Sequence, residues 1–134
     1  MDPSSEERLA KALQRYDGVV FAYLFGSQAT GGAGPRSDVD LAVHVEGPSE
    51  DAELDLHGIA ASALHRDDVD VLVLNRAPLT LQFEALKGRL LFSLDEGARV
   101  EIEARIMSTY HDRLPYLRRH LALFAEDVRE RGFA

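Results

Sequence analysis

The segment 38–45, DVDLAVHV, alternates between two kinds of side chain with a period of two residues. This period is typical of a β-strand, in which successive side chains point to opposite faces of the sheet. One face is purely aliphatic, and the other carries two carboxylates; the aliphatic positions are Val39, Leu41, Val43 and Val45, and the opposite ones are Asp38, Asp40, Ala42 and His44. The chain must therefore build a sheet whose one face is apolar at this strand and whose other face accommodates two acids.

Other segments supply the partners of such a strand. Apolar runs at 19–25 and 69–74 predict two buried strands, and 89–93 predicts a short fourth one. Apolar residues at helical spacing predict four helices, which lie at about 4–16 with a serine as N-cap, from Ser49 to about 65, at 79–87, and from 95 onward. Pro115 should kink the last helix or break it in two. This order predicts a single domain over residues 1–134, of the α/β or α+β class.

The composition narrows the classes of protein that this chain can belong to. Its 134 residues contain no cysteine, which excludes a disulfide framework, a cysteine nucleophile and a thiolate metal site. No apolar run approaches the roughly 20 residues of a membrane helix, so we expect a soluble cytoplasmic protein. The net charge of −8 argues against direct nucleic-acid binding, which normally needs a basic face. It fits either a solvated acidic surface or a cluster of carboxylates that holds a metal.

Three acids form the candidate metal site. Asp38 and Asp40 share one face of their strand, where two charges about 5 Å apart repel by roughly 3 kcal/mol at an effective dielectric of 20. A hard cation such as Mg²⁺ reverses that repulsion, although the same spacing also occurs on solvent-facing strands. Asp70 completes a cluster if the strand 69–74 lies beside 38–45. Asp68 shares the face of Asp70 but lies at the entrance to the strand, just before its first residue, where a structural or solvating role is expected.

A glycine-rich segment, 26–37, joins the first two strands. Gly26 at the end of an apolar strand allows a close approach of the backbone to a ligand, and Ser27 with adjacent N–H groups can bind an anion. Gly-Ser after a strand is also an ordinary turn. Neither a Walker A sequence nor a G-x-S-x-G elbow is present, so the pattern favours neither a P-loop nor an acyl-transfer serine.

Gly26-Ser27, ten residues, Asp38-x-Asp40 and then the isolated strand acid Asp70 resemble the signature of the nucleotidyltransferase superfamily that includes DNA polymerase beta. The short chain, with its segments 69–78, 81–84, 88–92 and 103–116, is similar to the MntA-type minimal nucleotidyltransferases, the antitoxins of HEPN/MNT toxin–antitoxin pairs. Thr30 departs from that pattern, because such loops often carry a basic residue there. The resemblance implies a minimal nucleotidyltransferase fold, with a mixed β-sheet flanked by helices and a long C-terminal helical segment over about 95–134.

The resemblance also implies a role for each site residue. Gly26 and Ser27 would hold the β- and γ-phosphates of ATP, and Asp38 and Asp40 would ligate two Mg²⁺ ions. Asp70 would ligate the catalytic ion and help to activate the attacking hydroxyl. MntA relatives transfer AMP to a tyrosine of their HEPN ribonuclease toxin (HepT-like) and silence it. Two alternatives stay open: a stand-alone transferase that acts on a small-molecule acceptor, and an antitoxin that only binds its partner.

Two features outside this motif leave open questions. His44 shares the carboxylate face, where we expect a hydrogen-bonded structural residue rather than part of the site. The apolar stripe between Ile102 and Val128 either docks on a partner or folds back over the sheet as core. Lys87, Arg89 and Arg105 are expected to be exposed cations without a role in the site.

Overall fold

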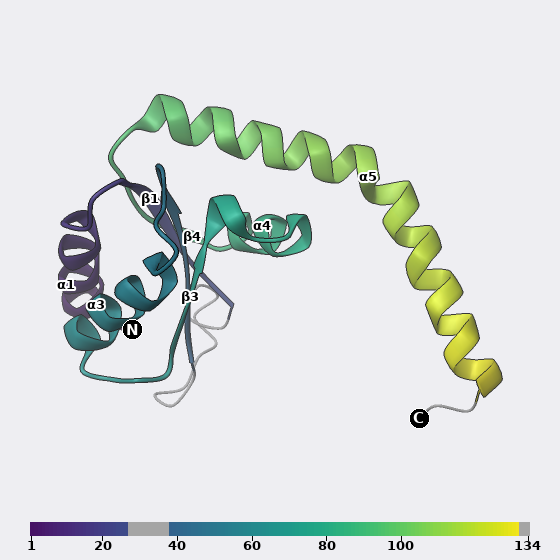
Figure 1. The fold of residues 1–134 in the computed structure, drawn as a ribbon, viewed down its shortest axis with the longest axis horizontal. Coiled ribbons are helices and arrows are strands. Elements are labelled where there is room, and N and C mark those ends of the chain that lie inside the picture. Colours follow the sequence, from purple (N-terminus) through teal and green to yellow (C-terminus); the bar gives the residue numbers. More distant parts are fainter. Residues whose placement is uncertain (27–37, 132–134) are drawn as a thin grey trace.

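The computed structural model describes residues 1–26 and 38–131, with the side chains of all of these except Leu117 and residues 121–131. Figure 1 shows a twisted sheet that has helices on both faces and one long helix extending away from it. The helices are α1 (Pro3–Gln14), α3 (Ala52–Leu64), the short 3-10 helix η1 (Leu74–Arg76), α4 (Leu79–Leu86) and α5 (Glu96–Arg131). The strands are β1 (Val19–Phe25), β2 (Val39–Val45), β3 (Val69–Val73) and β4 (Arg89–Ser93).

The four strands form one mixed sheet in the order β3-β2-β1-β4. β1 is antiparallel to β2 and to β4, whereas β2 and β3 are parallel and are connected through α3. A parallel pair needs such a crossover, because its two strands start at the same edge of the sheet. The predicted mixed sheet with flanking helices is thus confirmed, and so are the strand at 89–93 and the adjacency of β2 and β3.

The aliphatic face of β2 is the centre of the larger core. Its residues are buried against α1 and α3, which cover this face of the sheet (Figure 1). Leu9 and Leu13 of α1 and Leu56 of α3 are fully buried there. Burial of side chains of this size stabilises the fold by roughly 1.5–3 kcal/mol each. The alternation in 38–45 therefore predicts correctly which face of β2 is buried.

The opposite face carries a second core that α4 and α5 cover only in part. Phe21 and Tyr23 of β1 pack there with Leu74, Ala85 of α4 and Ile106 of α5. These residues lie away from the edge at which β2 and β3 begin. The acids of β2 and β3 project from the same face, but at that edge, where no described helix covers them completely.

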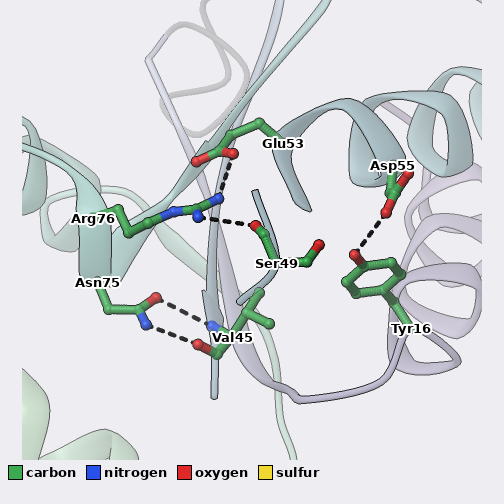
Figure 2. Close-up of polar contacts among 7 residues, drawn as sticks. All are labelled: Tyr16, Val45, Ser49, Glu53, Asp55, Asn75 and Arg76. Atoms are coloured by element: carbon green, nitrogen blue, oxygen red, sulfur yellow. Dashed lines mark hydrogen bonds and ion pairs between the residues drawn. The ribbon is translucent and has the colours of Figure 1, made fainter. Parts of the chain in front are cut away.

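Two helices start at residues other than those the sequence predicts. The N-cap of α1 is Asp2, whose carboxylate accepts a hydrogen bond of 2.7 Å from the backbone N–H of Ser5, and Pro3 occupies the first turn. Proline is favoured at that position because its missing N–H would have no helical partner. α3 begins after Asp51, and Ser49 lies before it. The carbonyl oxygen of Ser49 accepts a hydrogen bond from Arg76, which holds it outside the helix (Figure 2).

A side-chain clamp closes the far end of the parallel strand pair. The Asn75 side chain in η1 accepts from the Val45 N–H at 3.3 Å and donates to the Val45 carbonyl at 2.7 Å (Figure 2). The amide thus continues the β-ladder by one residue after β3 has ended, which satisfies the backbone of Val45. This clamp fixes η1, and with it the start of α4, against the end of β2.

α5 contains Pro115 and remains one continuous helix through residue 131. Figure 1 shows that it bends part way along, so the predicted kink is confirmed and the predicted break is not. Its first half packs on α4 and, through Ile102 and Ile106, on the sheet. The second half points away from the sheet, so the described backbone does not fold back as core. Within the described residues, no helix is both long and apolar enough to cross a membrane.

Candidate functional site

Asp40 and Asp70 face each other across the parallel pair of β2 and β3. The register places Val39 opposite Val69 and Asp40 opposite Asp70. Adjacent strands lie about 4.8 Å apart, so the two carboxylates start from neighbouring backbone positions on one face of the sheet. Asp38 precedes β2 at the same edge and is exposed, as is Asp70, whereas Asp40 is half-buried. Strand pairing thus gathers three acids that lie up to 32 residues apart in the sequence.

Gly26 leaves room for the Asp40 carboxylate. β1 ends at Phe25, which pairs with Asp40 across the antiparallel ladder, and the next residue is Gly26. Gly26 has a φ of +71°, and a Cβ added to it would lie 2.5 Å from Oδ2 of Asp40. Any larger residue would therefore be strained by its backbone and would collide with the acid. The glycine that the sequence assigned to ligand binding also gives the Asp40 side chain its space.

The electrostatics of this edge favour a cation. The pKa of Asp40 is raised by burial first, then by the negative charges of Asp70 and Asp38. None of the three acids forms an ion pair with a described residue. Carboxylate oxygens are the donors that Mg²⁺ prefers, and a bound cation would relieve the repulsion that raises this pKa. These are therefore the side chains at this edge whose chemistry suits a divalent metal.

The acids form an open row rather than a closed cage. Among the residues that the structure describes, no three histidine, aspartate or glutamate side chains converge closely enough to hold a metal ion. The fit to Mg²⁺ accordingly rests on the donor chemistry, on the shared face and on the space at Gly26. Because Mg²⁺ binds through a few carboxylates together with water and phosphate oxygens, an open row is compatible with it.

Asp68 belongs to the same face but is already neutralised. Both of its carboxylate oxygens accept hydrogen bonds from the Arg66 guanidinium, each at 2.5 Å. These bonds lower the pKa of Asp68 and raise that of Arg66. The ion pair agrees with the structural role expected for Asp68 and separates it from Asp38, Asp40 and Asp70. Sequence reasoning missed Arg66. An arginine two residues before an acid in a short loop can indicate such a bidentate ion pair.

Part of the predicted site lies outside the described residues. Ser27, proposed as a phosphate ligand, belongs to the segment 27–37, and so does Thr30. The phosphate contact of Ser27 therefore stays a prediction. Gly26 is described and lies directly beside Asp40, while its phosphate contact also stays a prediction.

His44 does not belong to this site, and its surroundings differ from those expected. It lies four residues along β2 from Asp40, which corresponds to roughly 13 Å. Its ring stacks on Phe21 with centroids 4.9 Å apart and planes inclined by 3°. Its Nδ1 is buried without a hydrogen-bond partner among the described residues, so the expected hydrogen bond to this atom is not found. Stacking, which the pattern of a single strand does not reveal, holds the ring in place.

Comparisons with known proteins agree with this geometry. The family model for "Polymerase beta, Nucleotidyltransferase" matches residues 7–97. A crystal structure of a toxin–antitoxin with AMP-PNP is similar at a TM-score of 0.74 and 25% identity, over 92% of this chain and 98% of that one. The toxin–antitoxin MntA–HepT is similar at a TM-score of 0.68 and 23% identity, over 93% and 97% of the two chains.

A third similar structure is the tri-AMPylated Shewanella oneidensis HEPN toxin in complex with MNT antitoxin. Its TM-score is 0.68 at 23% identity, over 93% of this chain and 96% of that one. No curated protein gives a significant match. These likenesses agree on one fold, and the family match includes Gly26, Asp38, Asp40 and Asp70.

Proposed function

The chain belongs to the polymerase beta nucleotidyltransferase family, and we propose that it is an antitoxin that transfers AMP from ATP to a tyrosine of a HEPN ribonuclease toxin. We further propose that residues 1–134 act as one nucleotidyltransferase domain. In this domain the helical segment over about 95–134 is available to contact the partner. The reaction would depend on Mg²⁺ and would silence the toxin.

The observation that carries this proposal is the pairing of Asp40 with Asp70 beside Gly26. A binding-only antitoxin has no need for acids that crowd one another, since such acids cost stability. A transferase does need them, because the charges on a triphosphate must be met by cations that the protein holds. The raised pKa of Asp40 is the electrostatic cost of this arrangement in the free protein.

Each residue of the motif has a distinct role in the proposed site. Asp38, Asp40 and Asp70 would hold two Mg²⁺ ions, and Gly26 with Ser27 would bind the β- and γ-phosphates. When bound, the metal supplies charge neutralisation on the phosphates and a lower pKa for the acceptor hydroxyl. The protein's own contribution is to orient the α-phosphate against the acceptor, which provides much of the catalysis in phosphoryl transfer.

The proposed transfer is a single displacement. The tyrosine oxygen attacks the α-phosphorus of ATP and forms a new P–O bond, while the bond from the α-phosphorus to the bridging oxygen breaks. The electron pair of that bond leaves with pyrophosphate. A carboxylate oxygen of Asp70 accepts the phenolic proton. The products are O-AMP-tyrosine and pyrophosphate.

The partner and the nucleotide are inferred from the similar structures. The toxin–antitoxin structure with AMP-PNP, at 25% identity, supports both a toxin partner and an adenine nucleotide, since AMP-PNP is an ATP analogue. The complex with the tri-AMPylated HEPN toxin is 23% identical and supports the fold alone. Transfer of AMP by the present chain is therefore our proposal, and so is the tyrosine as its acceptor.

The test is a reconstituted reaction. The purified chain is mixed with ATP, Mg²⁺ and the HEPN toxin encoded beside its gene, and intact-mass and peptide spectra of the toxin are recorded. We expect the mass of one or more AMP groups on tyrosine, dependent on Mg²⁺ and absent with Asp40→Asn. AMP transfer to a small-molecule acceptor, with the toxin unmodified, would favour the stand-alone transferase. Full neutralisation of the toxin in cells by Asp40→Asn would favour an antitoxin that only binds.

A further inference from the structure

A cavity of about 360 Å³ lies between the sheet, α4 and α5, away from the carboxylate edge. Volumes of this size are typical of small-ligand sites. Its apolar wall comes from η1, α4 and α5, and its polar groups come from four elements; the lining residues are His44, Leu74, Asn75, Leu79, Gln82, Ile102, Arg105, Ile106 and Thr109. The cavity thus combines an aliphatic wall of four side chains with five polar side chains that can orient a ligand.

Two of the polar side chains are already engaged in holding the fold. Gln82 donates from Nε2 to the Leu74 carbonyl at 2.9 Å, which fastens α4 to η1. Asn75 is engaged with both backbone groups of Val45 (Figure 2). These contacts make the wall rigid, because they fix α4 and η1 relative to β2. A ligand in the cavity would therefore meet a largely preformed surface.

Two other polar groups have no hydrogen-bond or ion-pair partner among the described residues. Nδ1 of His44 is buried without a hydrogen bond to any of them, and a buried polar atom left in this state costs about 1–3 kcal/mol. Arg105 forms no ion pair or hydrogen bond with any residue that the structure describes. The two groups are close enough for the charge of Arg105 to affect His44.

The chemistry around His44 defines the ligand that would suit it. Burial lowers the pKa of His44, Glu46 acts to raise it and Arg105 acts to lower it, so the imidazole is neutral at pH 7. The Arg105 guanidinium is then the charge that faces the cavity. A complementary ligand places an anion against this guanidinium, contacts the His44 ring and covers the aliphatic wall.

We propose that this cavity binds a carboxylate that is attached to an apolar body. The carboxylate pairs with Arg105 beside the His44 ring, and the body packs against the aliphatic wall formed by residues such as Leu79 and Ile106. The carboxylate belongs either to a free small acid or to an acidic side chain of the toxin, and the experiment distinguishes these sources. Because His44 lies about 13 Å along β2 from Asp40, the cavity is separate from the nucleotidyltransferase site, and this inference does not depend on the proposed transfer.

The experiment follows the His44 imidazole by NMR in the full-length chain with isotope-labelled histidine. The signal is assigned by its loss in His44→Phe, which keeps a flat ring on Phe21. Hexanoate and phenylacetate are the probes, and neutral hexanamide is the control ligand. We expect saturable shifts with both acids and little response to the amide. Arg105→Gln should weaken binding about tenfold or more, because it removes a charge-assisted contact. Arg113→Gln, on the same helix but outside the cavity lining, is the matched control and should bind as the wild type does.

The outcomes are distinct. If adding the HEPN toxin displaces the bound acid, the natural carboxylate comes from the toxin; if both bind together, it comes from a small molecule. Shifts that do not saturate, equal binding of hexanamide, or unchanged binding by Arg105→Gln would each overturn the proposal. None of these results depends on AMP transfer, which Asp40→Asn tests separately.

Discussion

Oδ2 of Asp40 occupies the space in which a side chain at Gly26 would begin, since an ideal Cβ there would lie 2.5 Å from this oxygen. The glycine at the end of β1 and the acid in β2 are thus parts of one arrangement. The φ of +71° at Gly26 makes the arrangement specific to glycine, because other residues rarely adopt that conformation. This relationship yields a sharp test of the candidate site.

Gly26→Ala should lower both stability and transferase activity. The positive φ costs about 1–2 kcal/mol, and the new methyl must displace the Asp40 carboxylate. A misplacement of roughly 1 Å at such a site reduces a rate about a hundredfold. Urea unfolding and the rate of AMP transfer measure the two effects. Gly47→Ala is the matched control, because Gly47 has a φ of +56° and nothing within 4 Å of an added Cβ. It should lose similar stability and keep its activity; equal loss of activity in both variants would contradict the role of Gly26.

Asp40→Asn should stabilise the metal-free chain while abolishing transfer. The pKa of Asp40 is raised in the folded state, so the folded protein binds more protons than the unfolded one between the ordinary value of 3.8 and the raised value. Wild-type stability should therefore fall as the pH rises through this window, and the variant should lack that dependence. Activity should drop at least about a thousandfold. Thermal unfolding at pH 4 and pH 7 checks the sign, and a variant less stable than the wild type at pH 7 would contradict it.

Mg²⁺ should raise the melting temperature of the wild-type chain, because a cation that binds only the folded state stabilises it. Asp70→Asn should remove most of this shift, since Asp70 is the direct neighbour of Asp40 in the sheet. Asp67→Asn, at an exposed position three residues earlier, should keep it. The measurement is thermal unfolding over a range of Mg²⁺ concentrations. An identical shift in all three proteins would place the ion elsewhere.

The local sequence predicts the strands well and their surroundings less well. The alternation in 38–45 is a consequence of burial on one face, so it predicts β2 and the face of Asp40 correctly. The pairing of Asp40 with Asp70 is a non-local property of the β2–β3 register. From the sequence alone, the two acids come together only if the two strands are assumed to be neighbours. Two further contacts depend on side-chain geometry that no sequence periodicity encodes. They are the stacking of His44 on Phe21 and the bidentate ion pair between Arg66 and Asp68.

His44→Phe should stabilise the chain by about 1 kcal/mol, because it keeps the ring on Phe21 and removes a buried nitrogen that has no hydrogen-bond partner in the described part of the chain. The gain should increase as the pH falls. Burial lowers the pKa of His44 in the folded state, so the unfolded chain binds an extra proton below about 6.5 and wild-type stability declines there. Urea unfolding of both proteins at pH 8 and pH 5.5 isolates this difference, since the other histidines are common to both. A larger gain at pH 8 than at pH 5.5 would show that the imidazole is not held neutral.

Removal of residues 116–134 should leave the fold intact and weaken binding to the toxin. The described contacts of α5 with the rest of the molecule come before Pro115, through Ile102, Ile106 and the stacking of Tyr110 on Phe83. The backbone beyond the bend points away from the sheet (Figure 1), and most helical stability in proteins comes from tertiary packing rather than from the helix itself. We therefore expect cooperative unfolding with a melting temperature within a few degrees of the wild type.

The same truncation tests whether this half of α5 is a docking surface. Toxin binding, measured by calorimetry, should weaken about tenfold or more, because the sequence places an apolar stripe along this segment, whose backbone extends away from the sheet. Pro115→Ala tests whether the direction of the second half of α5 matters for binding. It keeps the apolar residues of the stripe and removes the proline that bends the helix. It should weaken binding less than truncation does and leave the nucleotide site unchanged. If the truncated chain no longer unfolds cooperatively, the segment contributes to the core rather than to a docking surface. A folded chain with undiminished toxin binding would instead place the partner interface on the sheet, α1, α3 or α4.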